Sequence, residues 1–182
     1  MELVRRLRKK TEIPLLLFSY YNPLFAYGFE ALTREARESG VDGFLITDIS
    51  VEEAAVPVEI MKRVGLDSVF LAAPTSTDAR IQRISHFSSG FIYAVSRTGV
   101  TGVQDSLSDE IAPLLNRIRA LSQLPVAVGF GISRPEQVRE VEKLADGVVV
   151  GSAIVRRIEE TLGDPRLPEL VGAFTRWLKG ES

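Results

Sequence analysis

The sequence predicts an α/β fold, a TIM-type (β/α)8 barrel that is incomplete, with six of the eight βα units present. Three observations lead to this prediction. Six short apolar runs recur along the chain, amphipathic helical stretches lie between them, and glycine-rich turns follow the last two runs. Continuously apolar runs are typical of strands buried on both faces of a parallel sheet. Every unit has the same polarity, and paired glycine-rich exits are typical of barrel phosphate sites, so a closed barrel is favoured over an open sheet.

The predicted strands start at intervals of roughly 20–35 residues, which is the spacing of βα units and not that of a solenoid. They are Pro14–Ser19, Gly43–Thr47, Ser68–Ala72, Gly90–Val95, Pro125–Gly129 and Asp146–Val150.

The predicted helices follow these strands, and their ends carry capping signals. Asp78 and Ser133 are suited to N-caps, while Gly40 and Gly65 fit helix C-caps. The helices are Phe29–Ser39, Val51–Val64, Asp78–Phe87, Asp109–Ser122, Pro135–Leu144, Ser152–Leu162 and Leu167–Leu178. Residues Glu2–Lys10 read as the end of a helix with no strand before it. We therefore expect the chain to start inside a fold, two strands short of a barrel that typically needs ~250 residues.

Composition limits the classes of function. The 182 residues, 45% of them hydrophobic, fit a single domain over residues 1–182. A net charge of −2 gives no electrostatic case for nucleic acid or an anionic membrane. The absence of cysteine and the single histidine exclude disulfides and His or Cys metal clusters, so no metal site is expected. The basic segment before Ile13–Phe18 superficially resembles a signal peptide but lacks a small-residue cleavage site, so we expect a cytoplasmic location.

Two glycine-rich strand exits are the best candidates for chemistry. Gly129–Ser133 and Val150–Ala153 each leave a strand and open a helix. Glycine lets the backbone approach an anion, and a helix N-terminus supplies free N–H groups with positive partial charge. Two such exits on adjacent final units can hold one phosphate between them. The alternative is that these glycines only make tight turns.

Other polar positions near strand ends have weaker signals. The segment Ser96–Val103 could close over a ligand, or it could be a surface loop without a role. Tyr93 could point at a ligand or belong to the core. Asp48 could act as a general base, but no second carboxylate stands at an evident pairing position, so a structural or interface role is favoured. Asn22-Pro23 is expected to be a turn or a contact point, and His86 a solvated helix residue.

These motifs, in this order, resemble the tryptophan synthase α chains. The resemblance runs from about Thr11 to Glu160 and depends most on Val100-Thr101-Gly102 together with Gly129–Ser133. The other matching segments are Tyr20–Pro23, the strand exit at Asp48, Ala73–Ser76 and Gly151–Ile154.

The resemblance implies a lyase that cleaves indole-3-glycerol phosphate to indole and glyceraldehyde 3-phosphate. It implies no cofactor in this chain, because pyridoxal phosphate belongs to the partner β subunit of an αββα heterotetramer. The implied roles are phosphate binding by Gly131, Gly151 and Ser152; the indole pocket for Phe18, Leu45, Tyr93 and Phe130; the closing loop for Thr101 and Gly102; and the β-subunit interface for Asn22 and Asp48.

The family's acid–base pair, a Glu and an Asp, falls upstream of Met1 in this resemblance, so no catalytic residue is assigned. Each general acid or base typically contributes 10²–10⁴-fold, so this polypeptide alone is expected to have little or no lyase activity. Two alternatives stay open: a non-catalytic phosphate-binding module that partners the β subunit, and another phosphate-binding barrel enzyme, such as an isomerase of the same pathway.

Overall fold

The structure, a computed structural model, describes residues 1–95, 107–129 and 131–181. The chain forms two compact units. The first contains residues 1–72, 76–92 and 121–124, and the second contains residues 73–75, 93–120 and 125–182. The expectation of a single domain over residues 1–182 stays a prediction.

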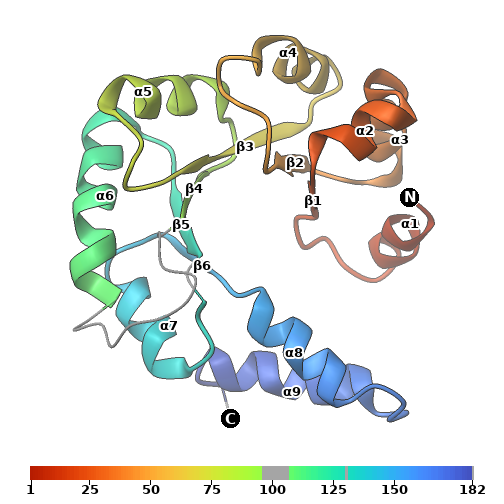
Figure 1. The fold of residues 1–182 in the computed structure, drawn as a ribbon. Coiled ribbons are helices and arrows are strands. Elements are labelled where there is room, and N and C mark those ends of the chain that lie inside the picture. The colour runs from red at the N-terminus through yellow and green to blue at the C-terminus, as the bar shows by residue number, and fades with distance from the viewer. Residues whose placement is uncertain (96–106, 130, 182) are drawn as a thin grey trace. The chain divides into compact units, whose positions relative to one another are not determined.

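The first unit begins with a helix and continues as alternating strands and helices (Figure 1). Its elements are α1 (Glu2–Arg8), β1 (Leu16–Ser19), α2 (Tyr21–Tyr27), α3 (Phe29–Ser39), β2 (Gly43–Ile46), α4 (Ala55–Arg63), β3 (Asp67–Ala72) and α5 (Asp78–Phe87). The strand order is β1-β2-β3. Both neighbouring pairs are parallel, with Leu16 opposite Gly43 and Gly43 opposite Asp67.

The core of this unit lies between the sheet and its helices. Phe29, Leu32 and Ala36 of α3 are buried in one cluster with Phe44 and Ile46 of β2. Because side chains alternate along a strand, the residues between those of the cluster point to the other face of the sheet. The apolar spacing of α3 therefore sets which face of β2 the helices cover.

Arg8 forms the hydrogen bonds that hold the N-terminal segment of the first unit. Its Nε donates to the carbonyl of Gly40 at 2.7 Å and its Nη1 donates to the carbonyl of Ile13 at 2.6 Å. It also pairs with Asp42, whose Oδ2 accepts the Leu15 N–H at 2.7 Å. These bonds fix the chain at the entrances of β1 and β2, and charge-assisted hydrogen bonds are among the stronger ones available.

The second unit contains most of β4 and α6 and all of the elements after them (Figure 1). Its elements are β4 (Ile92–Val95), α6 (Leu107–Leu121), β5 (Val126–Gly129), α7 (Pro135–Glu142), β6 (Gly147–Val149), α8 (Ser152–Glu160) and α9 (Leu167–Leu178). The strand order is β4-β5-β6, and β5 pairs with β6 in parallel. Helix α9 contacts both α7 and α8.

The predicted strands agree with the structure to within two residues at each end, and α3, α5 and α9 have the predicted bounds. The expectation of a turn at Asn22-Pro23 is wrong, because both residues lie in α2. Proline is tolerated in the first turn of a helix, where its missing N–H would have no partner. The N-caps also differ: Thr77 and Arg134 occupy these positions in place of Asp78 and Ser133.

Candidate functional site

The two glycine-rich exits of the second unit leave room for a ligand beside their backbone. Gly131 follows β5 with a φ of 53°, a left-handed conformation that favours glycine. Gly151 follows β6 as the N-cap of α8. A Cβ atom placed on either glycine would meet no atom within 4 Å. The left-handed φ accounts for glycine at position 131, whereas at Gly151 neither packing nor a positive φ requires glycine, and the space beside its backbone is open to a ligand.

The N-termini of α7 and α8 differ in whether a side chain accepts hydrogen bonds from the backbone N–H groups there. At α7 the Gln137 side chain accepts the N–H groups of Ser133 at 2.9 Å and Arg134 at 3.1 Å. At α8 the cap Gly151 has no side chain, and no side-chain cap bond is present. The first N–H groups of a helix have no intrahelical partner. The exposed start of α8, including the Ser152 hydroxyl, is therefore the better anion site.

Tyr93 lies against the end of β5. Along β4 and β5 the fully buried residues alternate with half-buried ones, and Tyr93 and Gly129 are both half-buried. A Cβ atom on Gly129 would overlap the Tyr93 phenol ring. The ring therefore occupies the space above Gly129, two residues before Gly131, and burial raises the pKa of its hydroxyl. Phe130, which the sequence also assigns to the pocket, lies outside the described residues.

In the first unit, the structure brings Phe18 and Leu45 together. They are register partners on the parallel strands β1 and β2. Both are absent from the core cluster that packs under the helices, so they lie on the other face of the sheet. Leu45 is 3% exposed, whereas Phe18 is 63% exposed and offers an open apolar surface.

Asn22 and Asp48 line one cavity of about 460 Å³, with Tyr21, Phe25, Ile49 and Glu53. The Asp48 Oδ1 atom accepts the Tyr21 N–H at 2.6 Å, at the start of α2. Asp48 therefore binds the N-terminus of α2, although α3 and β2 lie between that helix and Asp48 in the sequence. A carboxylate held this way performs a structural task, and the interface role of Asp48 stays a prediction.

Sequence reasoning missed two contributors, Gln137 and the Tyr21 N–H. Gln137 stands three residues after Arg134, which is the capping-box spacing, but Arg134 is not one of the Ser, Thr, Asp or Asn residues that mark a capping box in a sequence. The bond from Tyr21 to Asp48 joins residues 27 apart and has no local signal. Thr101 and Gly102, assigned to a closing loop, lie outside the described residues. Within the described part of the chain, no three His, Asp or Glu side chains are grouped to hold a metal ion.

Comparisons with family models and with curated proteins point to one family. The family model described as "Tryptophan synthase alpha chain" matches residues 1–170. The tryptophan synthase alpha chain of Solibacter usitatus is 51% identical over 179 residues, which are 98% of this chain and 67% of the relative. That of Geotalea uraniireducens is 49% identical over the same shares. The chain thus spans about two thirds of the length of these curated relatives.

Solved structures of tryptophan synthase from Pyrococcus furiosus are similar as well. A mutant alpha subunit (E244A) matches with a TM-score of 0.87 and 36% identity, covering 98% of this chain and 71% of that one. The tryptophan synthase complex matches with a TM-score of 0.86 and 35% identity over the same shares. The likeness confirms the predicted incomplete TIM-type barrel, with the six strands of the described residues corresponding to six of its βα units. No helix in the described residues is long and apolar enough to cross a membrane.

Proposed function

Because the chain belongs to the tryptophan synthase alpha chain family, a family of lyases, we propose that it serves the cleavage of indole-3-glycerol phosphate to indole and glyceraldehyde 3-phosphate. The observation that carries the proposal is the uncapped start of α8 beside Gly151, where a phosphate has open access to free backbone N–H groups.

We assign the phosphate to Gly131, Gly151 and Ser152. The positive end of the α8 dipole favours the dianion, and the Ser152 hydroxyl can donate to one of its oxygens. Tyr93, whose ring lies above Gly129 at the end of β5, is assigned to the wall that receives the indole. That Phe18, Leu45 and Phe130 also contact the indole ring of the substrate stays a prediction.

Proton transfer is not assigned to Asp48. The retro-aldol cleavage needs a base that accepts a substrate proton and an acid that returns one to the indole ring. The Asp48 Oδ1 atom already accepts the Tyr21 N–H at 2.6 Å. Protonating this carboxylate would weaken the bond that holds α2, which opposes its use as a base.

We propose the β subunit of tryptophan synthase as the protein partner, in an αββα assembly. The cavity lined by Asn22 and Asp48 is its suggested contact, because it combines apolar Phe25 and Ile49 with polar groups. No cofactor is assigned to this chain, and pyridoxal phosphate is assigned to the partner. A cytoplasmic location stays a prediction.

Calorimetric titration with glycerol 3-phosphate tests the phosphate site. The Gly151→Val substitution puts a branched side chain where the anion approaches, so we expect affinity to fall at least about tenfold. No atom outside the neighbouring residues lies within 4 Å of the added Cβ, and circular dichroism checks that the variant is folded. Gly172→Val on α9 is the matched control, since its Cβ meets only the Arg176 guanidinium at 3.6 Å. Equal affinities of the two variants would overturn the assignment.

A second measurement separates the lyase from its alternatives. Indole release from indole-3-glycerol phosphate, measured with and without the β subunit, reports turnover. Turnover that depends on Gly151 supports the lyase. Binding of glycerol 3-phosphate and of the β subunit without turnover would support the phosphate-binding module instead. Turnover of a different phosphorylated substrate would support another barrel enzyme.

A further inference from the structure

One side chain, that of Gln137 in the first turn of α7, holds the exit from β5. Its Oε1 atom accepts the Ser133 N–H at 2.9 Å and the Arg134 N–H at 3.1 Å, and the Ser133 hydroxyl lies 3.5 Å from the same oxygen. Gly131 stands two residues before Ser133, so the Cα atoms of these two residues lie at most about 7–8 Å apart. The Gln137 oxygen is therefore bound directly to the turn that carries one of the phosphate-site glycines.

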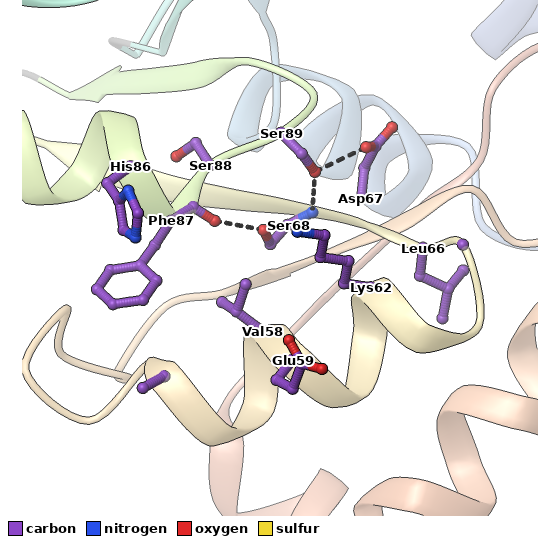
Figure 2. A pocket seen from close by; sticks show the side chains of 12 residues that line it. Val58, Glu59, Lys62, Leu66, Asp67, Ser68, His86, Phe87, Ser88 and Ser89 are labelled. Carbon is purple, nitrogen blue, oxygen red and sulfur yellow. Dashed lines mark hydrogen bonds between the residues drawn. The ribbon is translucent and has the colours of Figure 1, made fainter.

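The two ends of β5 are held by different chemical groups. At the amino end, the Val126 N–H donates to the carboxylate of Asp146 at 2.9 Å. The entrance of β3 also depends on a carboxylate, because the Ser89 hydroxyl accepts the Ser68 N–H at 3.1 Å and donates to Asp67 Oδ1 at 2.7 Å (Figure 2). A carboxylate is thus the final acceptor at both of these strand entrances, whereas an uncharged amide holds the exit from β5.

A glutamate at position 137 would hold the same two N–H groups at least as well as Gln137 does. The third helical position of a capping box takes either Glu or Gln. Hydrogen bonds to a charged acceptor are roughly twice as strong as those between neutral groups, and the helix dipole stabilises negative charge in the first turn. Stability of the start of α7 therefore does not account for the uncharged side chain.

The charges already present at the two helix starts leave the exit turn without a nearby carboxylate that is shielded from solvent. At α7, the side chains of Arg134 and Glu136 are exposed, so water and salt screen their charges. The first turn of α8 contains no acidic residue. Gln137 is half-buried, and a charge there would act on a neighbouring anion with less screening.

We propose that Gln137 is a positioning residue of the phosphate site, whose amide oxygen holds the turn from Gly131 to Ser133 without placing negative charge beside the bound phosphate. The inference rests on the proposed phosphate site at Gly131, Gly151 and Ser152. An ionised carboxylate at position 137 would hold the turn equally well, but it would repel the phosphate dianion over a distance on the order of 10 Å. The uncharged acceptor therefore favours a doubly charged phosphate ester as ligand.

The Gln137→Glu substitution separates the two tasks of this side chain. The variant keeps both N–H acceptor bonds, so its midpoint of urea denaturation should equal or exceed that of the unaltered protein. Glycerol 3-phosphate, titrated by calorimetry at pH 8, should bind at least about tenfold more weakly. Gln82→Glu, at an exposed glutamine of α5 in the first unit, adds the same charge and should bind as the unaltered protein does. A role in helix capping alone would leave the affinity of Gln137→Glu unchanged, and that result would refute the inference.

The charge on the ligand provides a second readout. A phosphate monoester carries about two negative charges at pH 8 and nearer to one at pH 5, because its second pKa is about 6. Repulsion is proportional to this charge, so a tenfold loss of affinity at pH 8 should shrink to about threefold at pH 5, each relative to the unaltered protein. An equal loss at both pH values would indicate a distorted turn and would overturn the electrostatic role.

The Gln137→Ala substitution tests whether the side chain holds the turn. It removes the acceptor and adds no charge, so the midpoint of urea denaturation and the affinity for glycerol 3-phosphate should both fall. Unchanged affinity in this variant would refute the positioning role. Failure of the phosphate site itself is recognised separately, because Gly151→Val would then bind glycerol 3-phosphate as the unaltered protein does, or neither would bind it. In that case this inference falls with the site, whereas Gly151-dependent binding that Gln137→Glu leaves intact refutes this inference alone.

Discussion

Replacing Gly129 by alanine tests the contact between β5 and Tyr93. The new Cβ atom would overlap the phenol ring of Tyr93, which is half-buried and must move. Overpacking of this kind typically costs about 1–3 kcal/mol. Alanine recovers about 0.5–1 kcal/mol of backbone entropy relative to glycine in a strand. The expected net loss in the free energy of unfolding is therefore about 0–2.5 kcal/mol, or a lowering of Tm by at most about 10 °C for a chain of this length.

The assay is urea denaturation followed by circular dichroism. Gly147→Ala is the matched control on β6, because its Cβ would meet the Ala127 Cβ at 3.5 Å, an ordinary contact. Only the gain in entropy applies there, so this variant should be as stable as the parent or slightly more so. The two alanine variants should thus differ by about 1–3 kcal/mol.

A double-mutant cycle assigns the cost to Tyr93. In a Tyr93→Leu background the phenol ring is gone, and Gly129→Ala should become nearly neutral. The coupling energy between the two sites is expected within the range of about 0.5–3 kcal/mol seen for residues in contact. If Gly129→Ala costs as much with leucine at position 93 as with tyrosine, the ring does not occupy the space above Gly129, and the described position of Tyr93 is wrong.

Three further predictions concern single groups. Burial raises the pKa of Tyr93, and the hydrogen bond to Glu35 raises the pKa of Tyr27, so an ultraviolet titration should show late-ionising phenols, and Tyr93→Phe should remove one of them. The stability that Tyr93 contributes is fully present below the pKa of tyrosine in the unfolded chain. It is lost as the pH rises through the pKa of Tyr93 in the folded chain. The Tyr27 hydroxyl, 2.6 Å from Glu35, lowers the pKa of that carboxyl, so Tyr27→Phe should raise it in an NMR titration. The Glu35 contribution is present above the unfolded glutamate pKa and is lost as pH falls through the lowered one, and an unchanged Glu35 titration in Tyr27→Phe would contradict the assignment. Asp48→Ala should cost about 0.5–2 kcal/mol in urea denaturation, since the Tyr21 N–H loses its acceptor, while Asp48→Asn, which keeps one, should cost less.

Local patterns sufficed for most of the fold. The continuously apolar runs at Gly43–Ile46 and Ile92–Val95 predict strands, because a strand buried on both faces of a parallel sheet has no alternation of apolar and polar residues. This pattern can be recognised within four to six residues of sequence. The face of α3 that packs on β2 follows from the spacing of Phe29, Leu32 and Ala36 alone. Helix α2 escaped prediction because Tyr21–Tyr27 is short and contains Pro23, so its sequence carries a turn signal.

The candidate site was only partly within reach of the sequence. Gly131 and Gly151 stand out because a strand exit that opens a helix is a local pattern. The difference between the two helix starts depends on the Gln137 side chain, whose oxygen accepts the N–H groups of Ser133 and Arg134 at the start of α7.

The sequence by itself determined the order of strands and helices along the chain, the polarity of each unit and the glycines at the last two strand exits, because these follow from interactions between residues close in the chain. Tertiary structure alone decided that Asp48 caps α2 and that Tyr93 covers Gly129. Each of these depends on contacts between residues far apart in sequence, or on burial by such residues. No short-range pattern encodes such contacts, since the packing of whole elements brings the groups together.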